Sequence, residues 1–143
     1  MNLSTDTIDV LKNFSNINQN ILVKPGKTVQ TISTMKNILA EAEIKEEFGS
    51  EFAIYDLPEF LRSIELFDSP QLQFNGGTNV QINEEKSKQN IKYFFADKSV
   101  IVSPTKSITM PDNFVSFTFK KESFAKLMKA ATTLNLVDVA VVG

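Results

Sequence analysis

The chain has 143 residues, of which 15 are basic and 17 acidic, giving a formal net charge of −2 and a hydrophobic share of 42%. It contains no histidine and no cysteine, which excludes disulfide frameworks, thiolate metal sites and every nucleophile activated by histidine. No apolar run approaches the length of a membrane span, and the first residues lack the charged and apolar regions of a secretion signal. We therefore expect a non-enzymatic globular protein of the cytoplasm, with no metal, no cofactor and no membrane contact.

The first fifty residues predict a strand, a helix and a second strand, followed by a hairpin. Residues 1–3 are a short apolar start, Ser4 is a candidate helix cap, and 21–23 is an apolar strand. The helix between them is indicated by an apolar stripe at three- and four-residue spacing: Ile8, Leu11 and Phe14. The Asn-rich stretch 16–20 is interpreted as a helix stop rather than a binding motif.

A hairpin is predicted over residues 28–34 and 37–44. Glu41 and Glu43 alternate with small or apolar residues in its second strand. Two such acids raise the alternative of a divalent metal site. A solvated strand face is favoured, because no third oxygen ligand stands at a suitable spacing.

The stretch 52–67 shows a strand, a cap and a helix. Residues 52–55 are an apolar strand, Asp56 stands at the N-cap with Glu59 as its capping-box partner, and Pro58 fits the first helical turn. The apolar face of this helix recurs at three- and four-residue steps: Leu57, Phe60, Leu61, Ile64, and Leu66 or Phe67.

Short strands follow at 72–74, 79–82, 91–95 and 99–102, and the first two flank a tight turn at 75–78. Gly76-Gly77 in that turn is a weak candidate for a phosphate cradle, because neither a Lys-Ser or Lys-Thr pair nor a helix follows it. The aromatic run Tyr93-Phe94-Phe95 is interpreted as core and sheet surface rather than as a platform for nucleobases, since Lys92 is its only basic neighbour.

The strand-helix-strand pattern then begins a third time. A strand at 114–119 precedes an apolar stripe, and a strand at 137–142 follows it. The stripe consists of Phe124, Leu127, Met128, Ala131 and Leu134. We predict a complete domain over 1–103, built from units 1–50 and 51–103, a linker over 104–112, and the truncated start of a second domain over 113–143.

Several stretches carry a family resemblance: LSTDTIDVLKNF at 3–14, VKPG at 23–26, AEAEI at 40–44, AIYDLPEFL at 53–61, and residues 96–104. Together they resemble the DNA polymerase sliding clamp of T-even-like bacteriophages. The resemblance implies an α+β DNA-clamp fold, with repeated β-α-β-β-β units, antiparallel sheets and helices on one face. It also implies three subunits closing head to tail into a homo-oligomeric ring, in the infected bacterial host cell.

The resemblance further implies a mechanism without bond chemistry. Such a ring encircles duplex DNA, attracts its phosphates without sequence preference and tethers the replicative DNA polymerase after a clamp loader has placed it. Exposed basic residues of the three helix regions are then the DNA-facing candidates: Lys12, Arg62, Lys120, Lys121, Lys126 and Lys129. Val102, Ile108 and Met110 are partner-binding candidates by position alone.

Two other functions stay open at this point. One is a clamp-fold protein-protein interaction or oligomerisation module that does not encircle DNA, because a fold does not settle a function. The other is a hydrolase that uses Glu41 and Glu43, which the sequence supports poorly. Ring closure depends on complementary edges at both ends of a subunit, so the expected truncation leaves it open.

Overall fold

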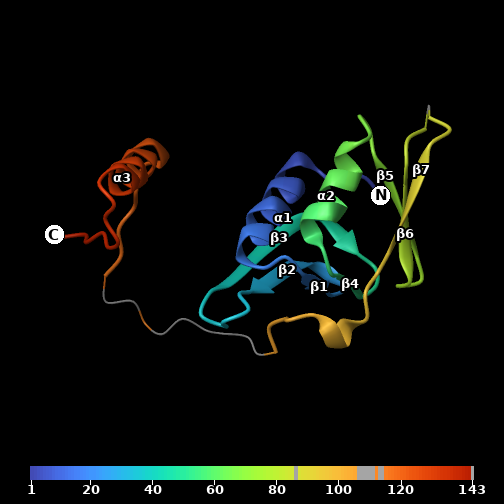
Figure 1. Cartoon of the computed structure of the whole chain (residues 1–143), viewed down its shortest axis with the longest axis horizontal. Coiled ribbons are helices and arrows are strands. Elements are labelled where there is room, and N and C mark those ends of the chain that lie inside the picture. The colour runs from blue at the N-terminus through green and yellow to red at the C-terminus, as the bar shows by residue number, and fades with distance from the viewer. Residues whose placement is uncertain (86, 106–111, 113–114, 143) are drawn as a thin grey trace. The chain divides into compact units, whose positions relative to one another are not determined.

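The computed structural model describes residues 1–85, 87–105, 112 and 115–142. The helices are α1 (Thr5–Ile17), α2 (Leu57–Glu65), the 3-10 helix η1 (Lys98–Val100) and α3 (Lys121–Thr133) (Figure 1). The strands are β1 (Ile21–Val23), β2 (Gly26–Ile32), β3 (Leu39–Phe48), β4 (Phe52–Ile54), β5 (Gln71–Asn75), β6 (Asn79–Asn83) and β7 (Asn90–Phe94). The chain divides into two compact units, residues 1–107 and 108–143.

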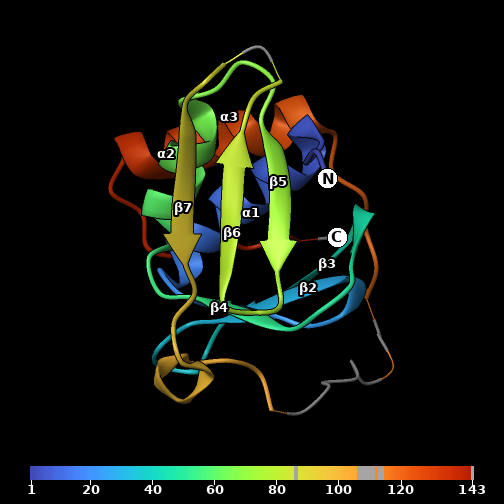
Figure 2. The ribbon, with the colours of Figure 1, turned by 90° about the vertical axis from the view of Figure 1, so that its right-hand side faces the viewer.

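The strands of the first unit form three small antiparallel sheets. β1 pairs with β4, β2 pairs with β3, and β5, β6 and β7 form a sheet with β6 in the middle (Figure 2). Along the chain, β4 is followed by α2 and then by β5, β6 and β7, which is the predicted pattern of a strand, a helix and further strands. The predicted α+β fold with antiparallel sheets is therefore confirmed.

Residues 1–3 were predicted as a strand, and this prediction is wrong. Met1 nevertheless lies beside β5, because the Met1 amino group donates to the Leu72 carbonyl at 2.9 Å and the Leu72 N–H donates to the Met1 carbonyl at 2.8 Å. This single exchange of hydrogen bonds resembles one rung of an antiparallel ladder. It is too short to count as a strand.

Helix α2 forms with the N-cap residue and the first-turn proline that its sequence predicts. The Asp56 carboxylate accepts a hydrogen bond from the Glu59 N–H at 2.8 Å, and Pro58 occupies the first turn, where its missing N–H leaves no bond unmade. The apolar face is buried in one hydrophobic core, with Phe67 and not Leu66 as its last member, because Leu66 is exposed: Leu57, Phe60, Leu61, Ile64 and Phe67. α1 contacts α2, and the two helices lie side by side against the sheets (Figure 1).

Aromatic rings fill the part of this core that lies between the strands. The Phe52 ring stacks on that of Phe95 at a centroid distance of 4.8 Å, and Phe48 meets Phe52 edge to face at 5.2 Å. Tyr93 packs edge to face on Phe60 at 5.1 Å. Tyr93 and Phe95 are thus part of the packed interior, as predicted, whereas Phe94 between them is exposed.

The predicted strand at 99–102 is wrong. The Asp97 carboxylate instead accepts a hydrogen bond from the Ser99 N–H at 2.8 Å and caps η1. An aspartate that bonds to backbone two residues further on offers the chain a turn in place of a ladder. Local hydrogen bonding therefore overrides the strand preference of the apolar run Val100-Ile101-Val102.

The second unit contains α3 as predicted, but its two predicted strands are wrong over the described residues 115–119 and 137–142, which have no regular structure. A strand needs a partner for its N–H and carbonyl groups, and the described part of this unit contains no other strand. Ala131 is the one residue that is buried among those described here. No helix in the described part of the chain is both long and apolar enough to cross a membrane.

Candidate nucleic-acid interface

The outward faces of α1 and α2 carry the first two DNA-facing candidates. Lys12 follows the buried Leu11 on α1 and points away from the core, and Arg62 follows the buried Leu61 on α2. Both basic side chains are exposed. The helical period brings the apolar residues to the sheets and leaves these basic residues off the apolar stripe.

Lys12 does not stand alone on this face. Its ammonium lies 2.6 Å from a carboxylate oxygen of Glu65, which comes from α2. The hydrogen bond and the charge of Glu65 raise the pKa of Lys12, and the charge of Asp9 adds a smaller effect in the same direction. The face formed by α1 and α2 therefore has mixed charge rather than a uniformly positive potential.

Acidic residues also accompany Arg62. Glu59 and Glu65 stand three residues before and after it on α2, a spacing that places side chains on neighbouring positions of one helix face. Among residues 1–85 and 87–105, no ion pair joins Arg62 to a carboxylate. Arg62 is thus the more available of the two basic groups on this face.

The four lysines of the third helix region have a simpler environment. Lys121, Lys126 and Lys129 are exposed. Helical geometry puts Lys126 and Lys129 on the side opposite the apolar stripe of α3, whereas Lys121 lies three residues before Phe124, at the edge of that stripe. Lys120 is the N-cap residue and has an extended backbone. None of the four forms an ion pair with any residue that the structure describes.

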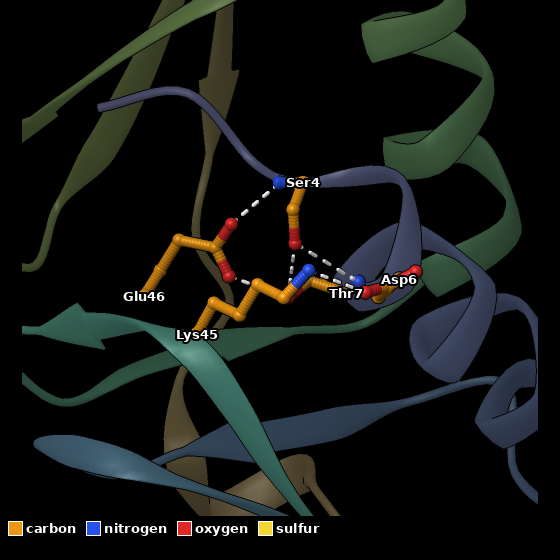
Figure 3. A network of polar contacts seen from close by, with 5 residues as sticks. All are labelled: Ser4, Asp6, Thr7, Lys45 and Glu46. Atoms are coloured by element: carbon orange, nitrogen blue, oxygen red, sulfur yellow. Dashed lines mark hydrogen bonds and ion pairs between the residues drawn. The ribbon is translucent and has the colours of Figure 1, made fainter.

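A polar network fixes the start of α1 on β3 (Figure 3). A Glu46 oxygen accepts a hydrogen bond from the Ser4 N–H at 2.5 Å, and its other oxygen accepts one from the Thr7 hydroxyl. Beside them the Lys45 ammonium lies 2.5 Å from the Asp6 carboxylate. Burial alone raises the pKa of Glu46, but the hydrogen bonds from Thr7 and Ser4 outweigh it and leave that pKa lowered.

Sequence reasoning missed this network. Ser4 was predicted as the cap, and it does accept a hydrogen bond from the Thr7 N–H at 3.3 Å. The role of Glu46 could not be found from spacing, because it stands 39 residues from Thr7 along the chain. The one local signal was Thr7 itself, a polar residue in a position that continues the apolar stripe.

Two asparagines hold the backbone at Val102. The Asn18 amide donates to the Ile32 carbonyl at 2.8 Å and to the Val102 carbonyl at 3.4 Å, while the Asn20 side-chain oxygen accepts from the Val102 N–H at 3.1 Å. The stretch interpreted only as a helix stop therefore also anchors the chain where the predicted linker begins. Val102 is half-buried, and the other two partner-binding candidates, Ile108 and Met110, lie outside the described residues.

The residues that the sequence raised as an alternative metal or hydrolase site and as a phosphate cradle have ordinary structural roles. Glu41 is exposed and accepts a hydrogen bond from the Gln30 side chain, and Glu43 is exposed on the same strand. Gly76 and Gly77 form the turn between β5 and β6 with φ of 58° and 73°, a conformation that favours glycine. Within the described residues, no three acidic side chains gather closely enough to hold a metal ion.

A family comparison covers the part of the chain that contains α1 and α2. The family model described as "DNA polymerase processivity factor" matches residues 4–103. The chain therefore belongs to the DNA polymerase processivity factor family.

Individual relatives are called "Sliding clamp". The chain is 34% identical to that of Escherichia phage RB69 and 32% identical to that of Vibrio phage KVP40, in both cases over 99% of its own length. The sliding clamp of Enterobacteria phage T4 is 32% identical over the same share. The chain spans 61% to 64% of the length of these relatives, which is less than two thirds.

Proposed function

We propose that this chain acts as a DNA sliding clamp, a processivity factor that encircles duplex DNA and tethers the replicative polymerase. The observation that carries the proposal is the family match over residues 4–103, which includes both α1 and α2. The name of the relatives supports it. Its partners are duplex DNA, the polymerase, a clamp loader and further copies of the chain in a trimeric ring, inside an infected bacterial cell.

The physical requirement of such a clamp is a weak attraction that ignores sequence. Exposed ammonium and guanidinium groups on helices contact phosphates, release counterions and read no base. The proposed contacts are Lys12, Arg62, Lys120, Lys121, Lys126 and Lys129. No bond is made or broken in this task, so we assign no catalytic residue and no cofactor. Val102, Ile108 and Met110 remain the proposed residues for binding a partner peptide.

The lysines provide the test. Neutralising Lys12, Lys126 and Lys129 together by substitution with Gln is expected to weaken binding to a mixed-sequence duplex by about tenfold or more at low salt. The slope of log affinity against log salt concentration should fall by about 0.9 for each phosphate that the variant no longer neutralises. Fluorescence anisotropy over a series of salt concentrations measures both quantities.

A second triple variant serves as the matched control. Lys24, Lys27 and Lys88 are exposed and lie outside α1, α2 and α3. Their replacement by Gln changes the net charge by the same amount as the first triple variant does. Binding that is reduced as strongly by the control variant would show that net charge alone matters. Binding that is unchanged in the helix variant would remove the assignment of the lysines.

The competing function is a clamp-fold interaction module that does not encircle DNA. The mixed charge around Lys12 favours it, because a carboxylate at 2.6 Å reduces the attraction of that lysine for phosphate. An interaction module predicts no salt-dependent binding to duplex DNA. The same series of salt concentrations therefore distinguishes the two functions.

A further inference from the structure

The Glu65 carboxylate pairs with the Lys12 ammonium, the same group that the proposed function assigns to contact with DNA phosphate. The Lys12 Nζ lies 2.6 Å from the Glu65 Oε1, and the pair bridges α1 and α2 on their outward face. The side chains are 49% and 48% exposed, so a phosphate in solution has access to the same ammonium. Glu65 and a phosphate are therefore alternative partners for one cation.

The ion pair is not what holds the two helices together. Beneath it, α1 contributes Leu11 and Phe14 and α2 contributes Phe60, Leu61 and Ile64 to the same buried core. Exposed ion pairs of this kind contribute little to stability, because water screens both charges. The contact can therefore open on binding without loosening the fold.

We propose that Glu65 is an internal competitor for phosphate, which holds the Lys12 ammonium in the free protein and weakens the attraction of this face for DNA. This inference rests on the proposed function. A tether that slides must exchange phosphates readily, and a carboxylate that recaptures the ammonium after each release favours that exchange. Glu65 is thus an affinity-setting residue rather than a stabilising one.

The competition between Glu65 and phosphate for Lys12 can be measured as a change in the affinity for duplex DNA. Replacing Glu65 by Gln removes both the competing carboxylate and its repulsion of phosphate, and it leaves a side chain of nearly the same shape. We expect the affinity for a mixed-sequence duplex at low salt to rise by about three- to tenfold. The slope of log affinity against log salt should steepen by up to about 0.9, the value for one additional neutralised phosphate.

Glu51 offers a matched control. It pairs with Lys98 at 3.1 Å outside the α1 and α2 helices, and its replacement by Gln changes the net charge by the same amount. We expect Glu51→Gln to change the affinity less than twofold. The double variant Lys12→Gln with Glu65→Gln should lose most of the gain, because the freed ammonium is then absent. Thermal unfolding of each variant of the 143-residue chain checks that the fold is retained.

The outcomes separate this inference from the proposed function. A gain in Glu65→Gln that is matched by Glu51→Gln, or that persists without Lys12, overturns the competition. An unchanged affinity in Glu65→Gln also overturns it, while salt-dependent binding by the unmodified chain leaves the proposed function standing. No binding by any variant at low salt contradicts the proposed function and this inference with it.

Discussion

A single carboxylate, that of Glu46, joins the start of α1 to β3 through Ser4 and Thr7. Because its pKa in the folded protein lies below the ordinary value of 4.5, the unfolded chain takes up this proton more readily than the folded one. The stability that Glu46 provides is therefore complete well above pH 4.5 and is lost as the pH falls through the lowered folded-state pKa.

Replacing Glu46 by Gln tests this pH dependence. At pH 7 we expect the free energy of unfolding to fall by about 1–3 kcal/mol, because a charge-assisted acceptor for two donors is removed. The difference from the unmodified chain should shrink as the pH falls below about 4, where the protonated carboxyl resembles the amide. Urea unfolding at several pH values measures this, with Glu47→Gln, a change at the exposed neighbour, as control. Parallel pH profiles for Glu46→Gln and the unmodified chain would contradict the assignment.

At the scale of one element, the stability of α2 depends on its N-cap residue, Asp56, which the sequence predicts. The Asp56 carboxylate satisfies the Glu59 N–H, one of the donors that a helix start leaves without a partner. We expect Asp56→Ala to lower the free energy of unfolding by about 1 kcal/mol, and Asp56→Ser to cost only a fraction of that, since a serine hydroxyl also caps. Chemical denaturation compares the two variants, and an equal loss in both would show that the cap is not the cause.

The elements that could be predicted from the sequence are those specified by nearby residues. α2 is an example, because Asp56, Pro58 and the apolar stripe all lie within one short stretch. Nearby residues also decide the structure at 99–102, where a strand was predicted. There the Asp97 carboxylate caps the 3-10 helix η1, and the predicted strand does not form. The hydrogen bond from the backbone to the Asp97 side chain competes there with the strand preference of consecutive β-branched residues.

The candidate interface was only partly accessible to sequence reasoning. Helical spacing alone places Lys12 and Arg62 on exposed faces, and the structure agrees. The ion pair between Lys12 and Glu65 joins residues of two helices. The hydrogen bonds of Asn18 and Asn20 to the Val102 backbone join residues more than eighty positions apart in the chain. No spacing rule within one sequence reveals contacts that depend on how separate elements pack.

At the scale of the whole molecule, buried apolar surface is distributed very unevenly. Residues 1–105 contain a continuous core, whereas in the described part of residues 108–143 Ala131 alone is buried. The apolar side chains of α3 are largely exposed, with Phe124 at 50% and Met128 at 47%. Since helices in proteins owe most of their stability to tertiary burial, the described structure implies unequal local stability.

Hydrogen exchange tests that inequality. We expect the backbone amides of α3 to exchange about a hundredfold or more faster than those of β6, because a helix of 13 residues is marginal without burial and the Lys120 N-cap makes no side-chain hydrogen bond. β6, by contrast, pairs with strands on both sides. Mass spectrometry of exchanged peptides measures both elements in one sample, and a dilution series shows whether any protection of α3 depends on association between copies. Protection of α3 equal to that of β6, and independent of protein concentration, would contradict the prediction.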